Sequence, residues 1–148
     1  MRYLVDTNVL LRWSHADSLD HSVCTQAVEG MLDSGKDLCI CAQVLIEFWA
    51  VSTRPLSANG LGLTARQIRN QVANLREMFT ILPEPPDMAD RWQDVADKHS
   101  VQGKQAHDAR IAALMLAHDL THILTFNVDD FARYSDIAAV TPQDILHQ

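Results

Sequence analysis

Acidic and amide side chains occur in this sequence at places where chemistry could be carried out, and together they indicate a divalent-cation site. Asp6 directly follows a short apolar stretch, Glu47 lies among apolar residues in a helical pattern, and Asp108 begins a long apolar run. Asn127 and Asp130 belong to a later polar segment, TFNVDDF. Carboxylates held together in a partly buried site repel one another and raise each other's pKa values. A Mg²⁺ or Mn²⁺ ion removes that penalty, because both ions prefer oxygen ligands.

A metal site built from such residues has a natural chemistry. The bound ion supplies a hydroxide-like water and stabilises charge on a phosphoryl group, and two ions about 3.5 to 4 Å apart can serve the attacking and leaving oxygens. Several of these residues also have a purely structural explanation: Asp6 fits a helix N-cap, Asp108 fits the positive end of a helix dipole, and Asp129 and Asp130 fit a solvated loop. Glu47 does not, because an acid on an apolar helical stripe is uncommon unless it is paired. The set is more informative than any single member, and it favours phosphodiester hydrolysis.

The elements that would position these residues alternate along the chain. Short apolar stretches predict strands at residues 3–5, 38–41, 80–82, 122–124 and 138–140. Helical spacing of apolar residues predicts helices at 9–13, 21–32, 43–53, 64–79, 87–99 and 109–117, with a last helical turn from residue 141. Strands alternating with helices predict a parallel sheet covered on both faces. The carboxyl ends of such strands meet at one edge, so the acidic residues should converge there.

Length and composition indicate one globular domain. The 148 residues are 47% hydrophobic and 21% charged, and no apolar run approaches the roughly 20 residues of a membrane span. The sequence starts with a strand pattern rather than a signal peptide, and three cysteines without a paired spacing suggest neither a disulfide framework nor a zinc site. We therefore expect a cytoplasmic protein without a membrane partner. The net charge of −7 argues only against a surface that is basic throughout.

Aromatic and basic residues give weaker signals. Trp13, Trp49 and Trp92 are expected on core-facing sides of helices rather than on a base-stacking platform. Three arginines of the 64–79 helix share one face, which is either solvated or a contact for phosphate or a partner; they are Arg66, Arg69 and Arg76.

Four short motifs, taken in order, resemble those of the PIN-domain ribonucleases, and within them the bacterial VapC-type toxins. They are Asp6-Thr7-Asn8 after the opening strand, Glu47 in the first helix after the second strand, Asp108-Ala109 at the start of an apolar helix, and Leu124-Thr125-Phe126-Asn127 with Asp130-Phe131. The resemblance covers the whole chain in the order, spacing and length of these motifs.

The resemblance implies a three-layer α/β/α fold around a parallel sheet, with residues 1–148 as one PIN domain. It also implies a Mg²⁺- or Mn²⁺-dependent endoribonuclease that acts on RNA as the toxin of a toxin–antitoxin pair, a homodimer, and a cognate antitoxin that covers the acidic groove. Carried over by position, Asp6 and Asp108 would be metal ligands, and Glu47 would complete the acidic cluster and orient water.

One position departs from the pattern. Many PIN domains carry an acid two residues after the threonine of the fourth strand, and this chain has Asn127 there. Its amide oxygen can still bind a metal but brings no charge. Asp129 or Asp130 is the expected substitute, so the number of bound metals stays open.

The same departure favours an alternative, a non-catalytic PIN-like module that binds RNA or protein.

The motifs that mark other α/β classes are absent from this sequence. No G-x-G-x-x-G follows the first strand, as a dinucleotide-binding protein requires, and Asn8 stands where a haloacid-dehalogenase-like phosphatase has its second aspartate.

Overall fold

A computed structural model describes all 148 residues, and its centre is a single five-stranded sheet in which every pair of neighbours is parallel. The strands are β1 (Arg2–Val5), β2 (Asp37–Cys41), β3 (Thr80–Leu82), β4 (His122–Leu124) and β5 (Ala138–Val140). Their order in the sheet is β3-β2-β1-β4-β5. After β1 the chain adds β2 and β3 on one side of β1, and it later adds β4 and β5 on the other side. The carboxyl end of β1 is therefore a topological switch point, the place where ligands bind in open α/β sheets.

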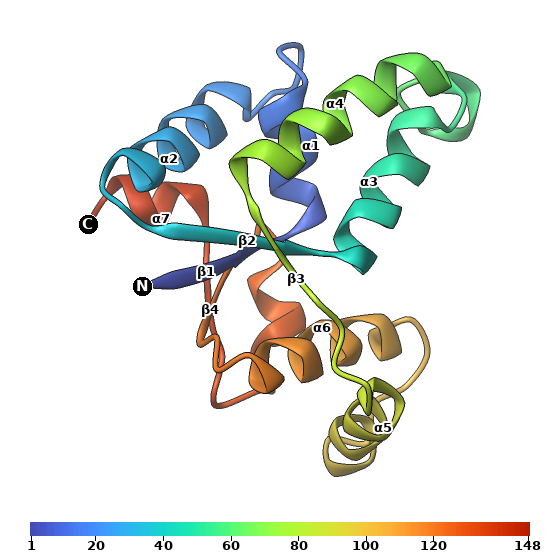
Figure 1. Cartoon of the computed structure of the whole chain (residues 1–148), viewed down its shortest axis with the longest axis vertical. Coiled ribbons are helices and arrows are strands. Elements are labelled where there is room, and N and C mark those ends of the chain that lie inside the picture. The colour runs from blue at the N-terminus through green and yellow to red at the C-terminus, as the bar shows by residue number, and fades with distance from the viewer.

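Helices cover both faces of this sheet, which confirms the predicted three-layer α/β/α architecture. In Figure 1, α1 to α4 lie above the sheet, whereas α5 and α6 lie below it. The helices are α1 (Thr7–Ser14), α2 (His21–Asp33), α3 (Ala42–Thr53), α4 (Ala65–Met78), α5 (Met88–Lys98), α6 (Gln105–Ala117) and α7 (Pro142–Leu146), and two 3₁₀ turns are η1 (Leu56–Ala58) and η2 (Val128–Phe131). No helix combines the length and the apolar character needed to cross a membrane.

Several helices begin where the sequence supplies a cap. The Asp6 side chain accepts a hydrogen bond from the backbone N–H of Thr7 and caps α1. Thr64 and Gln67 form a capping box at the start of α4, and Thr141 caps α7, with Pro142 in its first position. Asp6 thus has the structural role that its position predicted, and this role leaves its second oxygen free for other contacts.

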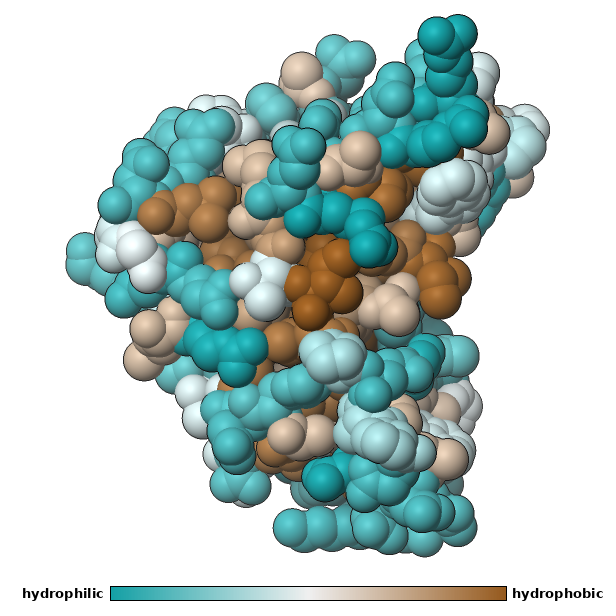
Figure 2. Space-filling view, in the orientation of Figure 1, coloured by the Kyte–Doolittle hydropathy of each residue, from teal (hydrophilic) through white to brown (hydrophobic).

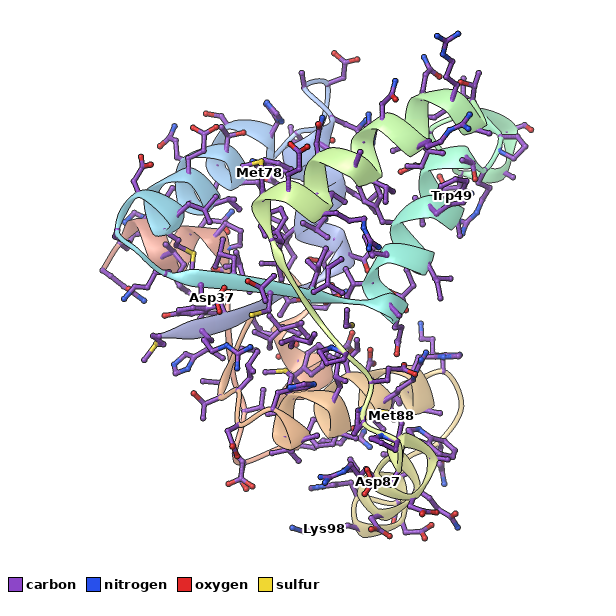
Figure 3. All side chains as sticks on the ribbon, viewed as in Figure 1. Asp37, Trp49, Met78, Asp87, Met88 and Lys98 are labelled. Atoms are coloured by element: carbon purple, nitrogen blue, oxygen red, sulfur yellow. The ribbon has the colours of Figure 1, made fainter.

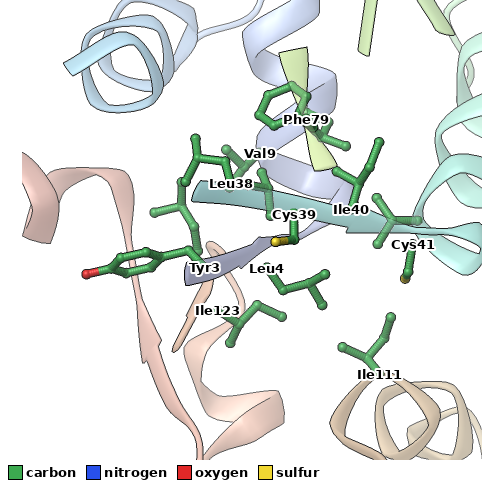
Figure 4. Close-up of a cluster of buried hydrophobic side chains, with 14 of the residues drawn as sticks. Tyr3, Leu4, Val9, Leu38, Cys39, Ile40, Cys41, Phe79, Ile111 and Ile123 are labelled. Atoms are coloured by element: carbon green, nitrogen blue, oxygen red, sulfur yellow. The ribbon is translucent and has the colours of Figure 1, made fainter. Parts of the chain in front are cut away.

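The core fills both faces of the sheet because the central strands alternate between them. In Figure 4, Ile40 of β2 points to the side of Phe79, whereas Cys41 points toward Ile111 of α6. All four of these side chains are buried. A strand buried on both faces reads as a continuous apolar run, which is how β2 was recognised in the sequence.

The prediction for one tryptophan is wrong. Trp13 packs edge-to-face on Phe79 with ring centroids 5.5 Å apart, and the Trp92 indole donates to the Ala106 carbonyl at 2.8 Å, so both face the protein interior. Trp49, in contrast, is 41% exposed and lies on the outer side of α3 (Figure 3). Helical spacing alone placed it on a core face, but α3 buries the opposite side, through Val44 and Phe48.

Candidate active site

Asp6 lies at the centre of the candidate site, directly after β1. Its Oδ1 accepts the backbone N–H of Thr7 at 2.8 Å. Its Oδ2 accepts the Thr125 hydroxyl at 2.8 Å and the Asn8 amide at 3.2 Å. Because β1 and β4 are neighbours, with Val5 opposite Leu124, the residue after each strand reaches the other across the sheet edge. The carboxylate orientation is therefore fixed by three donors.

Asn8 and Thr125 extend this network to the loop that follows β4. The Asn8 Oδ1 accepts the backbone N–H of Phe126 at 3.0 Å, and its amide nitrogen donates to the Thr125 Oγ1 at 3.2 Å. The same hydroxyl oxygen accepts the backbone N–H of Asn127 at 3.0 Å. Thr125 is completely buried, so its hydroxyl depends on these partners. The network holds the two strand ends, and hence Asp6, in a fixed relation.

Glu47 is half-buried on α3, and both of its carboxylate oxygens are held. Its Oε2 accepts the Thr7 hydroxyl at 2.8 Å, and its Oε1 accepts the Gln43 amide at 3.1 Å. Since Thr7 is the residue next to Asp6, the first contact places Glu47 beside the β1 carboxyl end. Two hydrogen bonds thus satisfy a carboxylate that lies among apolar residues of α3, where an unpaired acid would be unusual.

Asp108 lies in the first turn of α6 and is half-buried. Burial is the main cause that raises its pKa to about 6, and the negative charges of Asp130, Asp6 and Glu47 raise it further. The pKa of Asp6 is also raised, mainly by burial, although the hydrogen bonds from Thr125 and Thr7 act in the opposite direction. The charges of Glu47 and Asp130 thus act on both Asp6 and Asp108, and the charge of Asp6 acts on Asp108 as well.

The polar segment after β4 contributes one carboxylate to this group. Asp130, in η2, raises the pKa values of both Asp6 and Asp108. The charge of Asp129 is not among the causes that raise either pKa. Asn127 is exposed, and its backbone N–H, not its side chain, bonds to Thr125. Of the three candidates for the fourth position, Asp130 is the one whose charge acts at the site.

This donor set suits a hard divalent cation. The four side chains offer only carboxylate oxygens. They come from the residue after β1 and from α3, α6 and η2, and no cationic side chain is bonded to any of them. No three His, Cys, Asp or Glu side chains form a ready-made ligand group. Mg²⁺ usually keeps several waters and takes only one or two carboxylates directly, so a closed protein cage is not required. Asp6 and Asp108, whose pKa values are raised, are acids that a cation would stabilise in the ionised form.

Four side chains of the network carried no predicted role in the sequence. Thr7, Asn8 and Thr125 stood inside the recognised motifs, but their contacts depend on which strands are neighbours. Gln43 was not singled out, although its position one helical turn before Glu47 places both on one face of α3.

Comparisons with known proteins agree with the fold. A family model described as the PIN domain matches residues 3–137. VapBC2 from Rickettsia felis, bound to a DNA fragment from its promoter, is similar with a TM-score of 0.72 and 15% identity over 95% of this chain and 98% of that chain. VapC20 from Mycobacterium tuberculosis, a sarcin-ricin loop cleaving toxin, gives a TM-score of 0.66 and 17% identity over 89% of this chain and 95% of that chain.

A third solved structure, FitAcB from Neisseria gonorrhoeae, gives a TM-score of 0.59 and 21% identity over 97% of this chain and 99% of that chain. No curated protein matches the sequence significantly. At these identities the structural likeness establishes a shared fold, and the family model covers most of the chain. The chain belongs to the PIN domain family.

Proposed function

We propose that this protein is a Mg²⁺- or Mn²⁺-dependent endoribonuclease whose active site is the carboxylate cluster at the carboxyl end of β1. The observation that carries the proposal is the setting of Asp108, where burial, and then the charges of Asp130, Asp6 and Glu47, raise its pKa to about 6. Carboxylates that raise one another's pKa values cost stability, and a site of that kind points to function. Cleavage of RNA by the purified protein with Mn²⁺, abolished by a chelator, tests it.

The residues would divide the work as follows. Asp6 and Asp108 hold the cation together with Glu47, and Asp130 adds negative charge at the fourth position. The bound ion would supply a nucleophilic water and stabilise charge on the phosphoryl group. Glu47, fixed by Thr7 and Gln43, presents its carboxylate as the hydrogen-bond acceptor that orients the attacking water. Its two hydrogen bonds restrict its rotation, and this favours a reactive geometry.

The toxin assignment is supported by the similar structures. Several of them are VapBC, FitAB or FitAcB structures, and VapC20 is described as cleaving the sarcin-ricin loop. We therefore propose RNA as the substrate and a cognate antitoxin as a partner that covers the acidic groove. The alternative, a non-catalytic PIN-like module, rests on Asn127. The charge of Asp130 at the site weighs against it, and titration with Mg²⁺ separates the two, because only the enzyme requires the ion.

A homodimer is proposed on the strength of one surface. Apolar side chains of α3 and α4 line an exposed hollow of about 370 Å³, and they are Leu45, Ile46, Trp49, Ala50 and Val72. We call these five residues the α3–α4 patch. Ile46 is 64% exposed and Trp49 is 41% exposed. Figure 2 shows brown surface at the right-hand edge, over α3. An exposed apolar group of this kind marks protein contacts, and a two-fold axis would let the patch pack against itself.

Two further assignments complete the proposal. The whole chain, residues 1–148, forms one PIN domain, because α7 packs on α2 and Ile145 contacts the common core. The protein works in the cytoplasm, an assignment supported by Cys24, Cys39 and Cys41, which are buried and unpaired.

A further inference from the structure

Gln43 makes a connection that no other side chain of the site makes. It lies in the first turn of α3, is 7% exposed, and its amide nitrogen donates two hydrogen bonds. One goes to the Glu47 Oε1 at 3.1 Å, and the other goes to the backbone carbonyl of His107 at 3.0 Å. His107 precedes Asp108 in the first turn of α6, on the other side of the sheet from α3 (Figure 1). A single amide thus links the elements that carry Glu47 and Asp108.

The orientation of this amide is determined by its partners. Both are acceptors, so only the NH₂ group can face them. Turning the amide by 180° would place its Oε1 against a carboxylate and a carbonyl. In the observed orientation Oε1 is buried and has no hydrogen-bond partner. A buried acceptor without a partner is rare and destabilising in a folded protein. The observed orientation leaves one such acceptor but makes two hydrogen bonds that the opposite orientation would lose.

Few other side chains would serve at this position. A glutamate would repel Glu47 and the His107 carbonyl, and a methionine would fill the same volume without donating a hydrogen bond. An asparagine is one methylene shorter and cannot span both acceptors. The neutral amide with two N–H bonds therefore fits the geometry without changing the negative charge of the cluster.

We propose that Gln43 is a positioning residue that fixes Glu47 relative to Asp108, and so sets the spacing of the carboxylates for the cation. This inference rests on the proposed metal-dependent cleavage. Gln43 does not touch the substrate or the cation; it acts through Glu47 and through the first turn of α6. Loss of such an outer contact in metal sites typically weakens metal affinity or activity by about 10- to 100-fold.

The test compares wild type with Gln43→Met and with a matched control, Gln26→Met, which removes an exposed amide whose only bond goes to Ser22 on its own helix. Calorimetry measures the Kd for Mn²⁺ in the absence of RNA, and steady-state cleavage gives kcat and KM. For Gln43→Met we expect the Mn²⁺ Kd to rise about 10-fold or more and kcat to fall, with KM for RNA changed by less than about 2-fold. The control should match wild type.

Two contrary results are separable. Wild type that neither binds Mn²⁺ nor cleaves RNA would overturn the proposed function and this inference with it. The inference alone would be overturned if wild type binds Mn²⁺ and cleaves RNA, and Gln43→Met has the same Kd and kcat but a lower Tm. In that case Gln43 would contribute only to the stability of the fold. If Gln43→Met does not fold, Gln43→Asn keeps a polar side chain at the position and is expected to give the same loss of Mn²⁺ affinity.

Discussion

The hydroxyl of Thr125 donates a hydrogen bond of 2.8 Å to the Oδ2 of Asp6 across 119 positions of sequence. The two residues follow β4 and β1, which are neighbours only in the folded sheet. This bond lowers the pKa of Asp6, against the raising effect of burial and of the nearby carboxylates. The fold therefore raises the pKa of Asp6 by burying it, and limits this rise by supplying a hydrogen-bond donor from the neighbouring strand end.

Replacing Thr125 by valine should destabilise the protein. Valine keeps the shape of the side chain but removes a hydroxyl that is fully buried. Asp6 then loses one donor, and the side-chain amide of Asn8 and the backbone N–H of Asn127 each lose an acceptor. A loss of about 1–3 kcal/mol in the free energy of unfolding is expected. Urea unfolding of Thr125→Val beside Thr53→Val, whose hydroxyl bonds only within its own helix, measures it. Equal losses in the two variants would mean that the network adds nothing.

Asp108 should make metal-free protein less stable as the pH rises. Its folded pKa is about 6, above the ordinary value of 3.8. Between these values the folded state holds a proton that the unfolded state has released, so the free energy of unfolding falls as the pH rises from about 4 to about 6 and is level above that. At neutral pH, Asp108→Asn should then be more stable than wild type. The shift corresponds to at most about 3 kcal/mol, and solvent screening at a half-buried group reduces this to roughly 1 kcal/mol.

Thermal unfolding in the presence of a chelator at several pH values checks this dependence. The Tm of Asp108→Asn should exceed that of wild type by about 2–4 °C above pH 6, and the difference should vanish near pH 4. A variant that is less stable than wild type at every pH would show that the ionised Asp108 is satisfied without a cation.

A divalent cation should stabilise the folded protein through the same residues. With free Mn²⁺ at about 100 times its Kd, the gain is about 2.7 kcal/mol, which corresponds to a Tm higher by about 5–10 °C. The Asp6→Asn variant should lose most of this gain, whereas Asp33→Asn, an exposed acid at the end of α2, should keep it. A gain of the same size in Asp6→Asn would locate the cation elsewhere.

A charge placed in the α3–α4 patch should prevent self-association. Ile46→Asp is expected to give a monomer where wild type gives a dimer, without a large loss of Tm, because Ile46 is mostly exposed in the single chain. Light scattering after size-exclusion chromatography measures the mass, with Leu19→Asp as the control for an exposed leucine elsewhere. A dimer that survives Ile46→Asp would show that the contact lies on another surface.

Much of the fold could be predicted from the sequence because its elements are marked locally. The bounds of β3, β4 and β5 match the predicted stretches, and α7 begins at Pro142 after its Thr141 cap. Each of these signals depends on neighbouring residues only. Trp49 was misplaced for the same reason: its spacing on α3 is helical, but which side of α3 faces the core depends on how α3 packs against the rest of the chain.

The candidate site was predicted only in part. Asp6, Glu47 and Asp108 could be selected because each lies beside apolar residues, Asp6 and Asp108 near an element end and Glu47 within α3. The fourth position could not be decided among Asn127, Asp129 and Asp130, since the 3₁₀ turn η2 determines which of their charges reaches the site. The contacts of Gln43 required the distance between α3 and α6, which no local pattern contains.

The central claim is that the carboxylates at the β1 carboxyl end would hold a cation and form the site at which RNA is hydrolysed. The most direct measurement is the rate of RNA cleavage with Mn²⁺ by wild type, Asp6→Asn, Asp108→Asn and the control Asp33→Asn, with circular dichroism to verify that each is folded. We expect wild type and Asp33→Asn to cleave at similar rates, and the two site variants to lose at least about 100-fold in kcat, a loss of about 2.7 kcal/mol in transition-state stabilisation. Equal cleavage by all four folded proteins would contradict the account.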